Sequence, residues 1–107
     1  MARVDRIRAL LAETPDDPEL HYALAMEHSS AGDDAGCVNV LRAMIETFAA
    51  SPFIPAYLQA GQALARLDRT DEAAAVLRDG IAAAERLGTA DAMHARGEML
   101  GLLATVE

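Results

Sequence analysis

The sequence predicts an all-α fold built from antiparallel helical hairpins that stack side by side. The first observation is an internal repeat, because residues 18–52 match residues 54–88 at an offset of 36. The second is composition: apolar residues make up 52% of the chain and aromatic residues only 4%, so small and aliphatic side chains at close helix crossings must build the core. A period of about 20 to 50 residues is typical of stacked supersecondary units. The pairs in register are His21 with Tyr57, Ala25 with Gly61, Cys37 with Ala73 and Leu41 with Leu77.

The first helix is expected over residues 2–13, where apolar side chains recur at helical spacing. Thr14 and Pro15 end it, because a proline disfavours helical geometry in the residue before it. At 107 residues the chain can bury one core but not two, so residues 1–107 are expected to form one domain. The apolar positions of this helix are Val4, Ile7, Leu10 and Leu11.

The first hairpin, residues 18–52, is expected to consist of helices 18–31 and 35–49. Asp17 can cap the first of them and Pro18 suits its first helical position. A turn at Gly32 joins the two helices. One side of the first helix is lined by Leu20, Leu24 and Ala31. The apolar stripe of the second helix consists of Val38, Val40, Leu41, Met44, Ile45 and Phe48.

The second hairpin, residues 54–88, begins with a helix that has Pro55 in its first turn and reaches Leu67. Thr70 is a candidate N-cap for the next helix, which runs to about Leu87 and carries acidic residues near its positive end. Gly88 is placed to take the left-handed conformation that closes this helix.

A last helix is expected over residues 90–105, capped by Thr89. Together with helix 2–13 it can cover the open ends of the two repeats, as half of a following and half of a preceding hairpin. The predicted architecture is therefore a short right-handed superhelix of about six antiparallel helices. The apolar positions of the last helix are Met93, Leu100 and Leu103.

The repeat resembles the tetratricopeptide repeat, whose pattern places an aromatic residue, Leu-Gly and Tyr on one helix and a small residue on the next. The resemblance covers about residues 20–88 directly and is to the small stand-alone proteins of this family found in bacteria. The matching positions of the second repeat are Tyr57, Gly61, Ala73 and Leu77. In the first repeat His21 and His28 replace large aromatic residues, so strict repeat geometry between the hairpins is not expected.

In this family the first helix of each hairpin lines a concave groove that receives a peptide or helix. The resemblance therefore implies a non-enzymatic adaptor or scaffold, and Tyr22, Met26 and Leu58 would form the apolar floor of its groove. The alternative is that Tyr22 and Met26 simply pack against the sixth helix. The Lys and Asn residues that clamp a C-terminal carboxylate in chaperone-binding relatives are missing, which disfavours that ligand. The residues on the groove face are Glu19, Tyr22, Met26, Ser29, Leu58, Gln62, Arg66, His94 and Glu98.

The net charge and the hydropathy of the chain disfavour nucleic acid and membranes as partners, so the expected partner is a protein. Nine basic residues, all Arg, stand against seventeen acidic residues for a net charge of -8, which disfavours nucleic acid. The cluster of Arg3, Arg6 and Arg8 is better explained as a solvated helix face than as a membrane or phosphate site. No apolar run approaches the roughly 18 residues needed to span a bilayer, and the charged start is unlike a signal peptide. The expected location is the cytoplasm.

Chemistry at the histidines or the cysteine is the remote alternative. His21 and His28 lie two helical turns apart and Cys37 follows on the next helix, which is compatible with zinc. Packing explains all three better, because they fall on positions between helices. His94 is the other candidate for a metal site or an enzyme. Burial would disfavour the Cys37 thiolate, so a nucleophilic role is not expected. The sequence predicts no catalytic residue, metal or cofactor.

Self-association is the second functional hypothesis, with a two-fold homodimer formed by one of the end helices. The faces considered are Val4, Ile7 and Leu11, or Leu100, Leu102 and Leu103. Glycines inside the expected helices cost about 1 kcal/mol each relative to alanine, so they need a reason. Close helix crossing is the expected reason for Gly36, Gly80, Gly97 and Gly101, and the last two are alternatively a docking face on the final helix.

Overall fold

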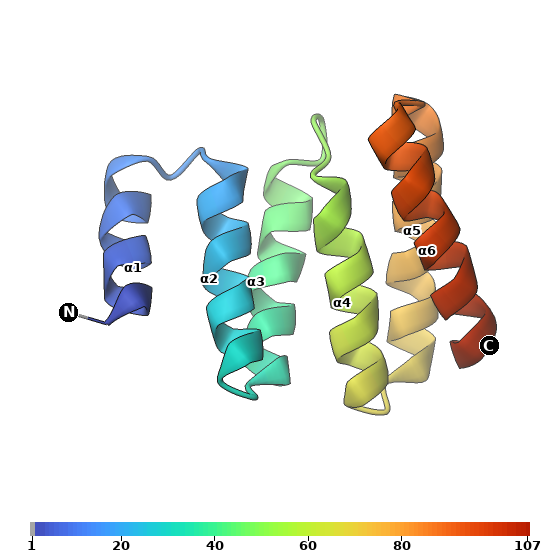
Figure 1. Ribbon diagram of the computed structural model, residues 1–107, viewed down its shortest axis with the longest axis horizontal. Helices are drawn as coiled ribbons and strands as arrows, with labels where there is room; N and C mark the ends of the chain where they lie inside the picture. Colours follow the sequence, from blue (N-terminus) through green and yellow to red (C-terminus); the bar gives the residue numbers. More distant parts are fainter. Residues whose placement is uncertain (1) are drawn as a thin grey trace.

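The computed structural model describes residues 2–107, and over them the chain folds into six helices that stand side by side (Figure 1). Their bounds agree with the sequence expectation to within about two residues, the usual uncertainty of helix ends. The helices are α1 (Arg3–Glu13), α2 (Pro18–Ser30), α3 (Asp34–Thr47), α4 (Ile54–Arg66), α5 (Thr70–Leu87) and α6 (Ala90–Val106).

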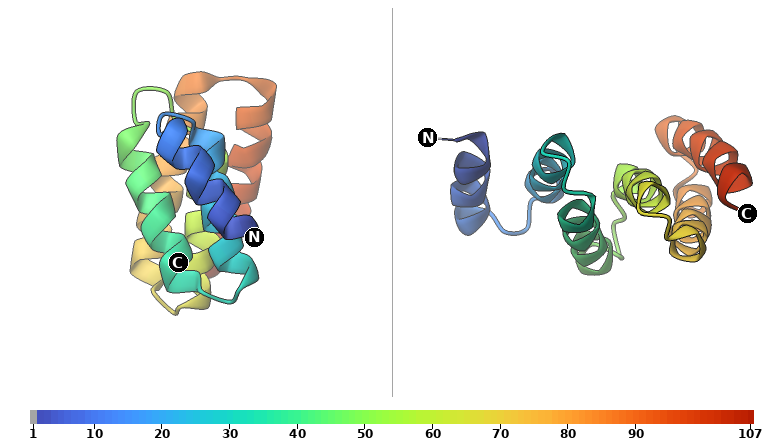
Figure 2. Two further views of the ribbon diagram at one scale, coloured as in Figure 1. Left: turned by 90° about the vertical axis from the view of Figure 1, so that its left-hand side faces the viewer. Right: turned by 90° about the horizontal axis from the view of Figure 1, so that it is seen from below.

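The helices form two rows, which are clearest in the view from below (Figure 2, right). The first helices of the hairpins, α2 and α4, stand in one row with α6, and their second helices, α3 and α5, stand in the other. α1 packs on α2 at one end of a molecule 41 Å long, and α6 lies at the other end. Each hairpin packs on the next, so the fold is an all-α superhelix of antiparallel helices, as predicted.

Local signals set most of the helix ends. The side chain of Asp17 accepts a hydrogen bond from the backbone N–H of Glu19 at 2.9 Å, and Thr89 accepts one from Ala92 at 3.1 Å, which confirms both as N-caps. Gly88 closes α5 with φ of 66°, in the left-handed conformation expected there.

Four of the expected local roles are wrong, those of Thr70, Gly36, Gly97 and Gly101. Gly97 and Gly101 mark no helix crossing among residues 2–107, because a Cβ built on either would meet nothing within 4 Å. Thr70 is the first residue of α5, and Arg69 occupies the N-cap position without making a side-chain cap. Gly36 does not mark a helix crossing, because a Cβ at this position would meet the side chains of Asp33 and His28 at the turn. Asp33 instead caps α3 by accepting a hydrogen bond from the backbone N–H of Gly36 at 2.9 Å.

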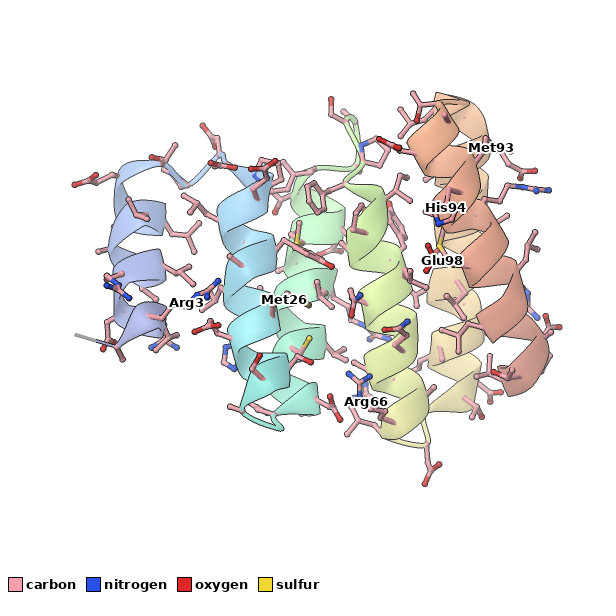
Figure 3. All side chains as sticks on the ribbon, viewed as in Figure 1. Arg3, Met26, Arg66, Met93, His94 and Glu98 are labelled. Atoms are coloured by element: carbon pink, nitrogen blue, oxygen red, sulfur yellow. The ribbon has the colours of Figure 1, made fainter. Side chains whose placement is uncertain are left out.

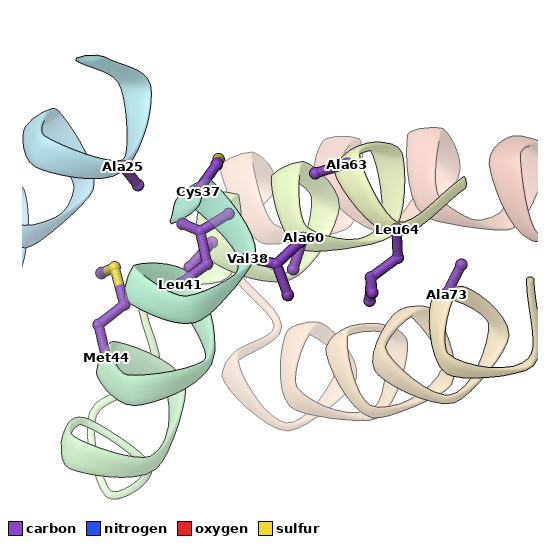
Figure 4. Close-up of a cluster of buried hydrophobic side chains, with 10 residues drawn as sticks. Ala25, Cys37, Val38, Leu41, Met44, Ala60, Ala63, Leu64 and Ala73 are labelled. Carbon is purple, nitrogen blue, oxygen red and sulfur yellow. The ribbon is translucent and has the colours of Figure 1, made fainter. Parts of the chain in front are cut away.

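The core consists of two clusters of buried apolar side chains. The first cluster joins α2, α3, α4 and the start of α5 (Figure 4). Its buried residues are Ala25, Cys37, Val38, Leu41, Met44, Ala56, Ala60, Ala63, Leu64 and Ala73. The second cluster joins α4, α5 and α6, and its buried residues are Ile54, Tyr57, Ala74, Leu77, Ala83, Ala84, Ala92, Met99 and Leu103. No buried polar residue is found among the described residues, so hydrophobic burial and close packing stabilise this fold.

The buried faces of α2 and α6 differ from the expectation. The one fully buried residue of α2 is Ala25, whereas Ala31 is exposed. α6 buries Ala92, Met99 and Leu103. Its expected core residues Met93 and Leu100 are exposed, at 40% and 41%. The end faces proposed for a dimer also change, because Ile7 and Leu103 lie inside the chain's own core.

The two steps of the superhelix, from α2 to α4 and from α4 to α6, are unequal in width. α4 and α6 pack on each other, whereas α2 packs on α1 and α3 and approaches α4 at most weakly. Gly80 explains the tighter step, because a Cβ there would lie 2.5 Å from Tyr57 Cβ on α4 and 2.6 Å from Met99 Sδ on α6. At the offset of 36, the same position in the first hairpin is Met44, a buried and much larger residue. The side chain of Met44 requires space that Gly80 does not. The step from α2 to α4 is therefore wider than the step from α4 to α6.

Candidate functional site

The residues of the expected groove lie on the row formed by α2, α4 and α6. Met26, Arg66, His94 and Glu98 are seen on this face from the same direction (Figure 3). Glu19, Arg66, His94 and Glu98 are exposed, and the remaining five are half-buried. The half-buried residues are Tyr22, Met26 and Ser29 on α2 and Leu58 and Gln62 on α4.

Tyr22 spans the wide step between the hairpins. Its ring lies 5.2 Å from the ring of Phe53, which directly precedes α4, at an interplanar angle of 48°. Tyr22 and Met26 both pack against the first core cluster. The alternative that they pack on α6 is wrong, because α2 has α1 and α3 as its neighbours. Burial raises the pKa of the Tyr22 hydroxyl, which therefore stays protonated at neutral pH.

Arg66 is held at the lower end of this face by an ion pair. Its Nε and Nη2 donate to the same oxygen, Oδ1 of Asp34, at 3.1 Å and 2.9 Å. Asp34 is the first residue of α3, so the pair ties α4 to the preceding hairpin. The side chain of Arg66 remains 47% exposed, but its charge is balanced by the carboxylate of Asp34.

The α6 side of the face carries an exposed pair within one helix. His94 Nε2 lies 3.3 Å from Glu98 Oε1, at the i, i+4 spacing that brings side chains together on a helix surface. Glu19 lies at the opposite side, in the first turn of α2. Because Arg66 is paired with Asp34, the open charges at the edges of the face are mainly acidic.

The histidines and cysteine of the first hairpin have structural partners. His21 Nε2 lies 2.7 Å from the carbonyl oxygen of Pro15, and its ring meets Phe48 edge-on at 5.6 Å. His28 Nδ1 lies 3.0 Å from Asp33 Oδ2. Cys37 is 1% exposed, and burial raises the pKa of its thiol, as expected for a packing residue. Within residues 2–107 no three side chains of metal-binding type are grouped closely enough to hold an ion.

A hollow of about 530 Å³ lies on the other row, between α3 and α5. Its lining residues are Arg42, Ile45, Glu46, Glu72, Ala75, Val76 and Asp79. The sequence does not predict this hollow, because the hollow depends on how far apart α3 and α5 stand. The available signal was the run of Glu72, Val76 and Asp79, which share one face of α5 by helical spacing.

Glu72 is the electrostatic centre of this hollow. Arg69 donates to it from Nε at 2.6 Å and from Nη2 at 2.9 Å, and Arg42 of α3 donates to it at 3.0 Å. These bonds, chiefly the ones from Arg69, lower the pKa of Glu72 to about 2. Arg42, Glu72 and Arg69 thus form a charged link between the two hairpins on the side opposite the groove.

The stability of the protein is expected to fall in acid partly because of Glu72. Its folded-state pKa of about 2 lies below the value of about 4.3 expected in the unfolded chain. The stabilising contribution is therefore present above about pH 4.3 and lost as the pH falls towards 2. Glu72→Gln is expected to lose less stability than the wild type between about pH 5 and pH 2.5.

Urea unfolding at both pH values, followed by circular dichroism, measures this difference. Glu46→Gln is the matched control, because Glu46 lines the same hollow and makes no ion pair within the described residues. The control is expected to follow the wild type. High salt should reduce the effect, since exposed ion pairs are screened. An identical acid response in the wild type and Glu72→Gln would contradict the assignment.

The stacked hairpins define a helical-repeat protein, and solved structures identify the repeat. The crystal structure of a tetratricopeptide repeat domain protein from Salinibacter ruber is 27% identical to this chain, with a TM-score of 0.73, over 85% of this chain and 96% of that one. A solution structure of a tetratricopeptide repeat domain protein from the same organism is 29% identical, with a TM-score of 0.75, over 87% and 89% of the two chains. The chain is a small tetratricopeptide-repeat-like protein.

This fold generally mediates protein–protein interaction and is not typical of enzymes. No family model and no curated protein matches the sequence. Among the helices of residues 2–107, none combines the length and the apolar character needed to cross a membrane.

Proposed function

We propose that this chain is a non-enzymatic adaptor that holds a peptide or helix of a partner protein against α2, α4 and α6. The observation that carries the proposal is the wide step between α2 and α4. Along this step Tyr22, Met26 and Leu58 keep part of their apolar surface open to solvent. Half-buried aromatic and methionine side chains are favoured in the centre of protein interfaces, where they contribute contact area.

The residues that would form the floor of the groove are already held in place in the free protein. Tyr22 is held by Phe53, and Met26 by the first core cluster, so neither side chain has to be ordered when a partner binds. Ordering a flexible side chain costs about 0.5 to 1.5 kcal/mol on binding. A preformed floor avoids that cost, and Gln62 beside it supplies donors and acceptors for the backbone of an incoming segment.

Charge specifies the chemistry of the partner segment. The open charges at the edges, Glu19 and Glu98, are acidic, while Arg66 is balanced by Asp34. The whole chain carries a net charge of -8. The segment that suits this groove is apolar in its centre and basic at its ends, because unlike charges favour encounter and orientation. We place the repeats 18–52 and 54–88, with their flanking helices, in one binding unit acting in the cytoplasm.

Binding of the partner is expected to be lost in Leu58→Asp and in Gln62→Arg. The first variant puts a charge on the apolar floor, and the second fills the groove with a long side chain. Gln62→Arg is the safer variant for folding, because Gln62 is already polar and partly open to solvent. The measurement is a pull-down from lysate of the source organism, followed by titration of the isolated partner segment and amide chemical-shift mapping.

Leu87→Asp is the matched control, because Leu87 is 45% exposed and lies at the end of α5, away from α2. It should retain the partner, and all variants should keep their helical circular dichroism. Shift changes centred on Tyr22, Met26 and Leu58 would support the proposal. A partner that the control and both groove variants retain equally would defeat it, as would shift changes centred on the hollow between α3 and α5.

A further inference from the structure

The outer side of α6 exposes apolar residues that no other helix within residues 2–107 covers. Met93 is 40% exposed and Leu100 is 41% exposed. Gly97 lies between them, and a Cβ built on it would meet nothing within 4 Å. Met93 lies on a different side of α6 from His94 and Glu98, so this face is separate from the proposed groove (Figure 3).

The internal repeat indicates which kind of helix packs on such a face. At the offset of 36, Met93, Gly97 and Leu100 fall on Tyr57, Gly61 and Leu64 of α4. In α4 all three equivalents are buried. The second helix of that hairpin, α5, covers them: a Cβ on Gly61 would lie 2.5 Å from Leu77 Cδ2, and Tyr57 approaches Gly80. α6 therefore presents the surface on which a first helix takes the second helix of its hairpin.

At the other end of the molecule, α1 is placed like the second helix of a hairpin, but no first helix of that hairpin lies among the described residues. It precedes α2 as α3 precedes α4 and α5 precedes α6, and it packs on α2 through Ile7. α1 lies at the end of the row, with no helix on its outer side (Figure 1). Its large apolar residue Leu10 is left 49% exposed.

The charges of the two end helices are complementary. α1 carries Arg3, Arg6 and Arg8 against Asp5 and Glu13, a formal excess of one positive charge, and Arg3 lies 3.6 Å from Glu27 of α2, which leaves Arg6 and Arg8 as its unpaired cations within the described residues. α6 carries Asp91 and Glu98 against Arg96, an excess of one negative charge, and Arg96 is already paired with Glu85 of α5. Two copies of α6 would repel each other, whereas α6 and α1 attract.

We propose that α1 of a second copy of this chain docks on α6 and completes its hairpin. The association is head to tail: one copy contributes α6 and the next contributes α1, so the superhelix continues from copy to copy. Such a contact is heterologous and does not close on itself, in contrast to a two-fold dimer. Leu10 of one copy and Leu100 of the other lie in the new interface.

The test is complementation between two single variants, Leu10→Asp and Leu100→Asp. Each retains one intact end, because the first keeps its α6 and the second keeps its α1. Both residues are more than two-fifths exposed in the free chain, so the variants are expected to fold, which circular dichroism checks. Sedimentation equilibrium at high micromolar concentration then gives the mass of each sample.

The wild type is expected to exceed the 11.3 kDa of one chain increasingly with concentration. Each variant alone should stay at 11.3 kDa, and their equimolar mixture should approach twice that mass. Added salt should weaken the association, since it screens the attraction between α1 and α6.

Three outcomes would overturn the proposal. Association by Leu10→Asp alone, strengthened by salt, would indicate a two-fold contact between copies of α6. A monomeric wild type at all concentrations would show that this face has another occupant or none. A mixture that stays at the mass of one chain would exclude head-to-tail docking. None of these outcomes depends on the groove, so the proposed adaptor function is tested independently.

Discussion

Replacing Leu77 with alanine is expected to lower the free energy of unfolding by about 3 kcal/mol, the largest effect of any single change considered. Leu77 is fully buried and touches Gly61, at the centre of the packing between α4 and α5. Truncation removes the transfer free energy of the side chain and leaves a cavity, because the helices on both sides are held by their own neighbours. Urea unfolding at neutral pH measures the change.

Leu87→Ala is the matched control for this prediction. Leu87 lies on the same helix but is 45% exposed, so its truncation should cost no more than about 0.5 kcal/mol. The double variant Gly61→Ala with Leu77→Ala adds a sharper test. A methyl group on Gly61 would partly fill the space left by Leu77, so the double variant should be more stable than Leu77→Ala alone. Equal losses for Leu77→Ala and Leu87→Ala would contradict the packing described for α4 and α5.

Alanine at two helical glycines is expected to have opposite effects. Gly80→Ala should destabilise the protein by up to about 2 kcal/mol, because overpacking costs about 1 to 3 kcal/mol and the gain in helix propensity returns about 1. The new methyl group would lie 2.5 Å from Tyr57 Cβ and 2.6 Å from Met99 Sδ. The Cβ of Tyr57 belongs to a buried residue of α4 and can move only if the helix moves.

Gly97→Ala is the internal comparison, since Gly97 also lies inside a helix but meets nothing within 4 Å. Only the propensity term remains there, so this variant should be more stable than the wild type by up to about 1 kcal/mol. Thermal unfolding at low micromolar concentration, where self-association does not contribute, compares the two variants. If both changes shifted the melting temperature in the same direction, the close approach of α4, α5 and α6 at Gly80 would be disproved.

The candidate site shows where prediction from sequence ends. The internal repeat and the family resemblance placed Tyr22, Met26, Leu58, Gln62 and Arg66 on one face, and Met26 and Arg66 are seen from the same direction on α2 and α4 (Figure 3). The balance of charge on that face was not predictable, because it depends on contacts between helices. Arg66 is neutralised by a residue 32 positions away, Asp34, and no local rule pairs them.

The face of α6 that enters the core is a second example. Its apolar residues fit two stripes, one through Met93 and Leu100 and another through Ala92, Met99 and Leu103. Helical periodicity does not choose between them. Packing against α4 and α5 decides which stripe is buried, because Gly80 on α5 leaves space for the side chain of Met99. The exposed stripe then becomes informative, because it repeats the α5-binding face of α4.

By itself, the sequence determined the six helices, most of their caps and their pairing into hairpins. These features depend on interactions within a few residues, such as Asp17 with the N–H of Glu19, and on the period of the repeat. Only the tertiary structure decided the unequal steps, the partial exposure of Tyr22, Met26 and Leu58, and the uncovered face of α6. Those features depend on side-chain volumes at helix crossings, where Met44 and Gly80 occupy equivalent positions. A difference in volume at one crossing moves whole helices relative to each other, and no local pattern encodes that displacement.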